Sequence, residues 1–260
     1  MSASPTSSPA GAADPTRTLA FEGCVNFRDL GGYRTADGRQ IGWRRLFRAD
    51  GLSKLTEADH RQLTELGVAT VIDLRTVDEA EQRGRFPVDR VPVRYVDLPL
   101  TDVLPTPEEL PSWGQASYVA GRYGEMVARG APALTGAFEV LGSGDALPAV
   151  FHCSAGKDRT GVLAALVLAF LGVPDRTIVE DYHLSAEAMV RLLQRLKAEY
   201  PDNVEEVERF APAVLQVVPE TMEEFLAALR SEYGSYDALA EWLGVVDAVE
   251  GLRRTVLVDA

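Results

Sequence analysis

The chain contains few cysteines and few histidines. Its 260 residues include two cysteines, Cys24 and Cys153, which excludes a disulfide framework and predicts two free thiols in a reducing compartment. It includes three histidines, of which His60 and His183 lack the spacing of metal ligands. The sequence therefore predicts no metal site and no cofactor.

Basic character and long hydrophobic runs are also missing. The net charge of -13 and the pI near 4.7 leave no basic patch, so nucleic acid is not an expected partner. The hydrophobic run at residues 162–171 is far too short to span a bilayer, and we expect no integral membrane association. What remains is the composition of an ordinary soluble enzyme, 46% hydrophobic and 25% charged.

The first residues have the composition of a tail. Residues 1–17 are rich in Ser, Pro, Ala and Thr, and they lack the basic start and hydrophobic stretch of a secretory signal peptide. We expect a disordered tail over residues 1–20 and a single domain over residues 21–260. The expected location is the cytoplasm, with a non-classical export route left open.

Helix and strand signals alternate through the first two thirds of the domain. Thr56 predicts the start of a helix that runs to Leu66, and Thr76 with Glu79 forms a capping box for another. Further helices are predicted over residues 115–129, 132–141 and 162–171, and strands over residues 68–73, 94–98 and 149–151. This alternation predicts an α/β fold with a central, mostly parallel sheet flanked by helices.

The pattern after Pro174 is helical throughout. Ser185, Pro219 and Ser235 mark expected helix starts, and the segment is acidic and amphipathic. The simplest interpretation of residues 174–260 is a helical extension that completes the core.

One ten-residue stretch, HCSAGKDRTG at residues 152–161, carries the strongest chemical signal. The residues before it, 149–151, are typical of a buried strand, and the run after it, 162–171, is typical of a buried helix. A tight loop between a strand and a helix points backbone N–H groups inward, with the positive end of the helix dipole behind them. The stretch therefore predicts an anion cradle.

The side chains of this loop add the chemistry of a phosphoryl site. Cys153 lies among loop amides, a helix N-terminus and Arg159, all of which favour a nucleophilic thiolate. Arg159 can grip two oxygens of a tetrahedral anion, and Lys157 adds a point charge. Thr160 can donate its hydroxyl to the cysteine sulfur, and Gly156 lets the loop turn. The predicted phosphate-binding residues are Ser154, Ala155, Gly156, Lys157, Asp158 and Arg159.

The motif resembles the signature loop of the cysteine-dependent protein tyrosine phosphatases, in the form found in dual-specificity and phosphoinositide phosphatases. Residues 26–32, 46–48 and 73–75 (NFRDLGG, LFR and DLR) follow in the order seen in a bacterial tyrosine/serine phosphatase family with a secreted mycobacterial member. Lys157-Asp158-Arg159 and Tyr233-Gly234-Ser235 also fit that family. The resemblance spans about residues 21–260 and implies a protein tyrosine phosphatase-like fold.

Such enzymes need a general acid to protonate the leaving group, and the resemblance implies a carboxylic acid upstream of the cysteine. Asp102 is the preferred candidate, because it lies in a loop and follows Leu98-Pro99 as in the mycobacterial pattern. Asp97, at the end of a predicted strand, is the alternative. The resemblance also suggests that part of the extension, near residues 185–215, forms a mobile lid over the site.

Several residues near the motif have two interpretations. Asp158 either assists the acid or positions water, or it pairs with a neighbouring cation to fix the loop. Arg48 and Arg75 either line the pocket or form structural salt bridges. Cys24 is either an ordinary buried thiol or a redox partner of Cys153. The residues expected to support the loop are His152, Thr160, Asn26, Arg28, Asp29, Arg48 and Arg75.

The sequence thus predicts a metal-independent phosphomonoester hydrolase that forms a cysteinyl-phosphate. Its catalytic candidates are Cys153, Arg159, Asp102 and Asp158. The expected substrates are phosphorylated proteins, phosphotyrosine first, with phosphoserine, phosphothreonine and phosphoinositides left open by Lys157. The competing interpretations are a small-metabolite phosphatase, a sulfurtransferase, a catalytically silent phospho-ligand binding module, and a cysteine that is only part of the core. We expect the protein to be a monomer.

Overall fold

A computed structural model describes residues 16–100, 106 and 108–260 of the chain. The tail predicted over residues 1–20 therefore lies, apart from residues 16–20, outside the described residues, and so does Asp102. Within the described residues no helix is both long enough and apolar enough to cross a membrane.

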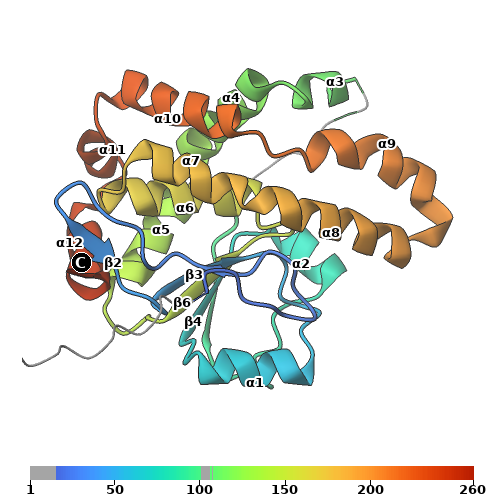
Figure 1. Cartoon of the computed structure of the whole chain (residues 1–260), viewed down its shortest axis with the longest axis horizontal. Helices are drawn as coiled ribbons and strands as arrows, with labels where there is room; N and C mark the ends of the chain where they lie inside the picture. The colour runs from blue at the N-terminus through green and yellow to red at the C-terminus, as the bar shows by residue number, and fades with distance from the viewer. Residues whose placement is uncertain (1–15, 101–105, 107) are drawn as a thin grey trace, which may run out of the picture.

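A five-stranded sheet forms the centre of the molecule (Figure 1). Its strands, in spatial order, are β1 (Arg28–Asp29), β3 (Leu46–Ala49), β6 (Ala149–His152), β4 (Thr70–Asp73) and β5 (Arg94–Asp97). Only the β1 and β3 pair is antiparallel, and the other neighbours are parallel. The predicted α/β architecture with a mostly parallel sheet is confirmed.

The register of the sheet brings three strand ends to one place. His152, the last residue of β6, lies opposite Ala49 at the end of β3 and Asp73 at the end of β4. Loops that follow parallel strands therefore emerge from the same edge of the sheet, which is where ligands bind in α/β folds. Cys153 is the first residue beyond this edge.

Two helices in the first third of the domain begin as the sequence predicts. The helix α1 (Glu57–Glu65) has Thr56 as its N-cap, and α2 (Val77–Arg83) has Thr76, with a complete capping box in each case. Each box satisfies backbone N–H groups that a helix start would otherwise leave without partners. Glu79 is the reciprocal partner in the α2 box.

Successive side chains along each strand point to opposite faces of the sheet, so the strands contribute to two hydrophobic cores, one on each face. Val71 and Val150 pack with Leu63 of α1 in the smaller core. Ile72 and Phe151 belong to the larger core on the opposite face. The helices that contribute to the larger core from the middle of the chain are α3 (Leu110–Trp113), α4 (Ala116–Arg129), α5 (Ala131–Gly142) and α6 (Asp158–Phe170).

The helix α6 begins earlier than predicted. The sequence suggested a start at residue 162, whereas the structure begins the helix at Asp158, so Arg159 and Thr160 lie in its first turn. All thirteen residues of α6 are buried. The polar residues of the motif hid the helix start, because hydrophobic periodicity is informative only where the residues are apolar.

The C-terminal part is a helical layer, as predicted, up to its last residues. It comprises α7 (Asp175–His183), α8 (Ser185–Glu199), the short helix η1 (Pro201–Asn203), α9 (Val204–Val214), α10 (Pro219–Tyr233), α11 (Tyr236–Trp242) and α12 (Val246–Val256). The prediction of a wholly helical segment is wrong at the end, where β7 (Leu257–Asp259) pairs antiparallel with β2 (Arg39–Ile41). This pairing joins residues more than 200 positions apart, which no local pattern reveals.

Candidate active site

Residues 153–157, named the catalytic loop after their predicted role, connect the central strand β6 to α6, all of whose residues are buried. Cys153 follows β6 directly, its side chain is 2% exposed, and α6 begins five residues later. Gly156 makes the turn with a φ of +68°, and a Cβ there would lie 2.6 Å from the carbonyl oxygen of Ala49. Only glycine avoids this overlap, so the shape of the loop depends on Gly156.

Two residues from the N-terminal third hold the back of this loop. Asn26 donates from Nδ2 to the carbonyl oxygens of Ala155 and Gly156, each at 3.1 Å. Arg48 donates from Nη2 to the carbonyl oxygen of Gly156 at 2.9 Å. Three hydrogen bonds from buried side chains therefore fix the orientation of two consecutive peptide groups.

The guanidinium of Arg159 is held by Glu79. Its Nη1 and Nη2 lie 2.5 and 2.8 Å from the two carboxylate oxygens of Glu79, which also accepts from Ser154 Oγ at 3.0 Å. Burial raises the pKa of Glu79, but the hydrogen bonds and charge of Arg159 outweigh it and lower the pKa to about 2. The sequence identified Glu79 only as a capping residue and missed this second contact.

Lys157 and Asp158 form a second charged pair in the loop. The Lys157 ammonium is 3.2 Å from Asp158 Oδ1, and it donates to the carbonyl oxygens of Val214 and Gln216 at 2.5 and 3.0 Å. Tyr123 donates its hydroxyl to Asp158 at 2.6 Å. Asp158 thus forms the ion pair with a neighbouring cation that one of its two interpretations expects. Lys157 in turn contacts the end of α9.

Arg28 belongs to a buried network behind the loop. It donates from Nη1 to Asn26 Oδ1 at 2.7 Å and from Nε to Asp181 Oδ1 at 3.0 Å. Asp29 makes its contacts elsewhere, contrary to the expectation that it supports the active-site loops. Its carboxylate accepts from the backbone N–H groups of Gly31 and Arg44, each at 2.8 Å, so it shapes the N-terminal loop instead.

Another buried carboxylate, Asp73, organises the end of β4. Arg75 donates to it from Nε and Nη2, and Tyr95 donates its hydroxyl at 2.6 Å. His152 is fully buried with Nε2 3.6 Å from Asp73, and burial lowers its pKa despite the opposing charge of Asp73. His152 is therefore neutral at pH 7, and its Nδ1 lies 3.2 Å from the carbonyl oxygen of Cys153.

The hydroxyl of Thr160 is fully buried in the first turn of α6. Among the described residues its oxygen has no hydrogen-bond partner, so the predicted bond to the cysteine sulfur is not formed in this structure. A buried hydroxyl without a partner is unusual, since burial without a hydrogen bond costs free energy.

Comparison with known proteins identifies the family of the chain. The model of the tyrosine phosphatase family matches residues 19–258. The chain belongs to the tyrosine phosphatase family.

Two relatives cover most of this phosphatase. The triple specificity protein phosphatase PtpB of Mycobacterium tuberculosis is 30% identical over 238 residues, covering 81% of this chain and 84% of PtpB. A Cupriavidus necator protein, provisionally named a tyrosine-protein phosphatase, is 30% identical over 228 residues, covering 84% of this chain and 81% of its own. Among solved structures, the core catalytic domain of the PP-IP phosphatase SIW14 from S. cerevisiae matches 79% of this chain and 93% of its own, with 13% identity and a TM-score of 0.37.

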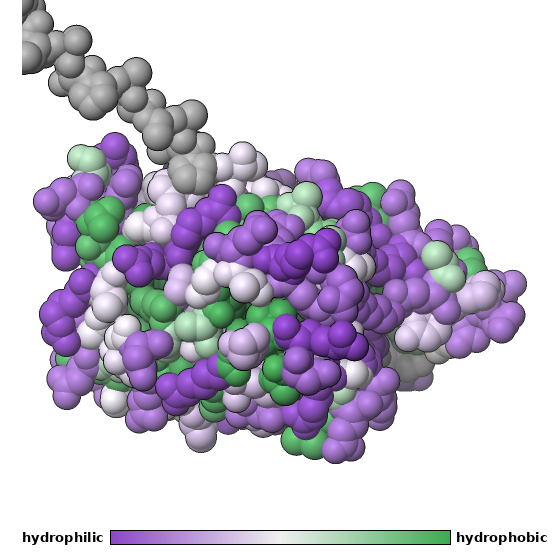
Figure 2. Space-filling model, turned by 90° about the horizontal axis from the view of Figure 1, so that it is seen from below, coloured by the Kyte–Doolittle hydropathy of each residue, from purple (hydrophilic) through white to green (hydrophobic). Residues whose placement is uncertain are grey.

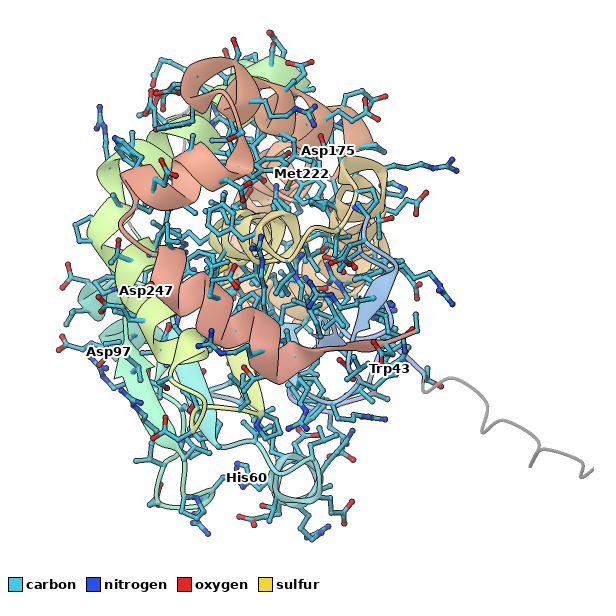
Figure 3. The ribbon with its side chains drawn as sticks, turned by 90° about the vertical axis from the view of Figure 1, so that its left-hand side faces the viewer. Trp43, His60, Asp97, Asp175, Met222 and Asp247 are labelled. Carbon is cyan, nitrogen blue, oxygen red and sulfur yellow. The ribbon has the colours of Figure 1, made fainter. Side chains whose placement is uncertain are left out.

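The phosphatase has two candidates for its general acid. Asp102 lies outside the described residues. Asp97 ends the edge strand β5, is 45% exposed and pairs with Arg85 at 2.8 Å. Figure 3 shows Asp97 at the outer side of the molecule. Asp97 is therefore poorly placed to protonate the oxygen of a leaving group beside the buried Cys153, because it forms an exposed ion pair on an edge strand.

A cavity of about 300 Å³ opens beside the catalytic loop of the phosphatase. Its wall includes Ser154 from the loop, and Leu192, Leu196 and Tyr200 in and just after α8. Arg195 of α8 also lines it and donates to the carbonyl oxygens of residues 22 and 23, each at 2.8 Å. The basic side chains that line the cavity are Lys54, Arg75, Arg83 and Arg195. The cavity thus lies between the loop and the segment that the sequence suggested as a lid.

The second cysteine of the phosphatase has its own partner. Cys24 is buried, and its sulfur donates to Asp50 Oδ1 at 2.5 Å. Burial and the neighbouring charge of Asp50 raise the pKa of the Cys24 thiol well above its usual value. Such a thiol is a weak nucleophile, which favours the interpretation of Cys24 as an ordinary buried residue. Within the described residues, no group of His, Cys, Asp and Glu side chains could hold a metal ion.

Proposed function

We propose that the phosphatase hydrolyses phosphomonoesters through a covalent intermediate on Cys153, with phosphotyrosine in proteins as its first substrate class. The observation that supports this most directly is the placement of Cys153 and Arg159 on one loop at the N-terminus of α6. The backbone carbonyls of Ala155 and Gly156 in that loop are held from behind by Asn26 and Arg48. A nucleophile and a planar cation around inward-facing amides are what phosphoryl transfer requires.

In the first step the Cys153 thiolate attacks phosphorus, an S–P bond forms, and the P–O bond to the leaving group breaks. The oxygen of the leaving group takes a proton from Asp102, and the loop amides with Arg159 stabilise the equatorial oxygens. In the second step water attacks phosphorus, the S–P bond breaks, and Asp102 takes a proton from the water. Inorganic phosphate leaves and the thiolate is restored.

The Cys153→Ser variant tests the nucleophile. We expect turnover of p-nitrophenyl phosphate to be abolished while inorganic phosphate still binds, because the amides and Arg159 remain. Wild-type turnover is expected to be insensitive to EDTA. Residual steady turnover by Cys153→Ser near the wild-type rate would contradict the covalent mechanism.

The general acid is tested by comparing Asp102→Asn with Asp97→Asn. Loss of the proton donor is expected to slow substrates with poor leaving groups about a hundredfold, and p-nitrophenyl phosphate much less, because p-nitrophenolate leaves without a proton. The phosphotyrosine peptide rate relative to the p-nitrophenyl phosphate rate is the measurement. If Asp97→Asn has this signature and Asp102→Asn does not, the assignment is wrong.

The breadth of the substrate class is a further part of the proposal. Lys157 in the loop and the four basic side chains around the adjacent cavity, which outnumber its two acidic ones (Asp50 and Glu199), favour substrates with more negative charge than a single phosphotyrosine, such as phosphoinositides. The relative PtpB carries the name of a triple specificity phosphatase. A panel of phosphotyrosine, phosphoserine and phosphothreonine peptides, phosphoinositides and sugar phosphates measures this directly. A preference for sugar phosphates over all peptides would instead favour a small-metabolite phosphatase.

Simple assays distinguish the phosphatase from a sulfurtransferase and from a silent phospho-ligand binding module. A sulfurtransferase would form thiocyanate from thiosulfate and cyanide without releasing phosphate from esters. A silent binding module would bind phosphate without turnover of p-nitrophenyl phosphate.

We also propose that the phosphatase acts as a monomer in a reducing compartment. On the face seen in Figure 2, hydrophilic side chains predominate and the hydrophobic ones form small scattered patches. Obligate dimers bury larger continuous apolar surfaces, so this face supports a monomer. The free thiols Cys24 and Cys153 support a reducing location such as the cytoplasm. Sedimentation equilibrium measures the oligomeric state.

A further inference from the structure

Asp181, near the end of α7, is a buried carboxylate outside the catalytic loop. Its side chain is 1% exposed and accepts hydrogen bonds from Arg28 Nε at 3.0 Å, Arg48 Nη1 at 2.6 Å and the Tyr33 hydroxyl at 3.0 Å. Burial alone would raise the pKa of Asp181, but the charges of Arg28 and Arg48 hold it below its usual value. The carboxylate is therefore ionised at neutral pH.

Two chains of hydrogen bonds lead from Asp181 to the catalytic loop. The short chain passes through Arg48, whose Nη2 reaches the carbonyl oxygen of Gly156. The longer chain passes through Arg28 to Asn26, whose amide reaches the carbonyl oxygens of Ala155 and Gly156. Both chains begin on one carboxylate and end on the carbonyl oxygen of Gly156, and the longer chain also reaches that of Ala155.

The geometry of the peptide bond gives these contacts a chemical consequence. In a trans peptide group the carbonyl and the following N–H point in opposite directions. Donors that hold the carbonyls of Ala155 and Gly156 on the outer side of the loop therefore turn the N–H groups of Gly156 and Lys157 toward the inner side. Those two N–H groups belong to the predicted anion cradle.

The network also carries charge. Arg28 and Arg48 are 2% and 1% exposed, and their shared carboxylate is Asp181, so two cations and one anion are buried together behind the loop. Burial and the charge of Arg28 lower the pKa of Arg48 to about 10, which leaves it charged at pH 7. The excess positive charge favours an anion in the cradle, because charges interact strongly in a poorly solvated interior.

We propose that Asp181 is a positioning residue for the phosphate-binding amides, acting through Arg48 and through Arg28 and Asn26. The inference rests on the proposed function, because it assigns the cradle to phosphate. Asp181 touches no reacting atom in this scheme. It orients the guanidinium groups that orient the loop.

Phosphate affinity in a Cys153→Ser background tests the proposal without requiring turnover. Calorimetric titration with inorganic phosphate compares Cys153→Ser alone with Cys153→Ser plus Asp181→Asn. We expect the dissociation constant for phosphate to rise about tenfold or more, because misaligned donors stabilise an anion less. A merely structural role would lower the melting temperature and leave the affinity of the folded protein unchanged.

Asp175→Asn in the same background is the matched control. Asp175 begins the same helix, pairs with Arg230 and the Tyr236 hydroxyl, and lies beside α10 in Figure 3. The same substitution there is expected to leave phosphate affinity unchanged. An equal loss in both variants would overturn the proposal, because it would indicate a general effect of weakening α7.

Arg48→Lys keeps the proposal testable if Asp181→Asn does not fold. Lysine preserves the buried charge, but its single nitrogen cannot replace the planar fork that bridges Asp181 and Gly156. We expect the same loss of phosphate affinity, and in the active enzyme a lower kcat per titrated active site. Unchanged affinity in a folded variant would overturn the positioning role. Failure of the proposed function has a different signature, since it would remove wild-type turnover, and a parent that binds no phosphate would contradict both.

Discussion

Glu79 makes two kinds of contact, one within the N-terminal cap of its own helix and one with the catalytic loop. Its carboxylate accepts from the backbone N–H of Thr76 as part of the α2 capping box, and it also holds both terminal nitrogens of Arg159. The start of α2 and the orientation of the phosphate-binding arginine therefore depend on the same side chain.

The Glu79→Gln variant separates the two contacts. Glutamine can still cap α2, but it loses the charge and one of the two acceptor oxygens that face Arg159. We expect kcat/KM for p-nitrophenyl phosphate to fall about tenfold, since an arginine oriented by one bond is less well aligned. Asp78→Asn, an exposed change in the same turn, is the control and should have no effect. An unchanged kcat/KM in Glu79→Gln would contradict the orienting role.

The same pair predicts a dependence of stability on pH. The pKa of Glu79 lies near 2 in the folded protein, against 4.5 for an ordinary glutamate, so its ionised form is stabilised by folding. Its contribution is complete above about pH 4.5 and is lost as the pH falls toward 2. Urea unfolding should show wild type more stable than Glu79→Gln at pH 7, and the difference should shrink toward pH 2.5. A constant difference would be inconsistent with this pKa.

The sequence revealed the residues of the loop and its supports Asn26, Arg28 and Arg48, but not the two carboxylates that hold the arginines. Cys153 and Arg159 belong to one continuous motif, whereas Glu79 is 80 positions from Arg159, and Asp181 is 153 positions from Arg28. Glu79 also had a sufficient local explanation as a cap, which hid its contact with Arg159. No local pattern in the sequence distinguishes Asp181 from its acidic neighbour Glu180.

Among the elements, α8 is the one whose attachment matters most for the site. It lies across the front in Figure 1, and Arg195 ties it to the carbonyl oxygens of residues 22 and 23. At the far end of the same segment, Lys157 binds the carbonyls of Val214 and Gln216 at the end of α9. The segment that the sequence suggested as a lid is therefore attached to the active-site region at two separate places.

Arg195→Ala should loosen the first of these attachments. Each lost bond involves a charged donor, so we expect the backbone amides of α8 to exchange hydrogen about tenfold faster or more. Hydrogen exchange followed by mass spectrometry measures this. Arg176→Ala is the control, because Arg176 forms an exposed ion pair with Glu180 on α7. Equal exchange in α8 of wild type and Arg195→Ala would show that other contacts hold the helix.

Elements with local signals were predictable, and elements held by distant partners were not. Thr56 as a capping residue and the capping box of Thr76 with Glu79 predicted the starts of α1 and α2, since both signals lie within four residues. The strand β7 has no such signal, because three residues become a strand only through their pairing with β2. Secondary structure imposed by tertiary contact is the usual limit of sequence patterns.

At the scale of the whole molecule, β2 and β7 join the two halves of the chain. Gly42 donates its N–H to the carbonyl of Val256, and Ile41, fully buried, pairs with Leu257. In Figure 1 this small sheet lies at the end of the molecule opposite α9. It fastens the N-terminal motif to the C-terminal helices at a distance from the catalytic loop.

Removal of residues 257–260 should lower stability without changing the chemistry. Loss of the strand pairing is expected to cost about 1–2 kcal/mol, which for a domain of this size is a decrease in Tm of several degrees. Differential scanning calorimetry measures the decrease, and removal of Ala260 alone is the control. The kcat measured well below the transition should stay at the wild-type value. A large loss of kcat would contradict the separation of this sheet from the site.

The network around Asp181 also bears on when the enzyme becomes active during synthesis. The catalytic loop draws its supports from Asn26 and Arg48 early in the chain and from Asp181 late in it. A nascent chain that has exposed the complete HCSAGKDRTG motif, but not yet α7, has the nucleophile without the carboxylate that organises its surroundings. Contacts of such long range form late in folding. Phosphatase activity should therefore appear on the ribosome only after α7 has emerged.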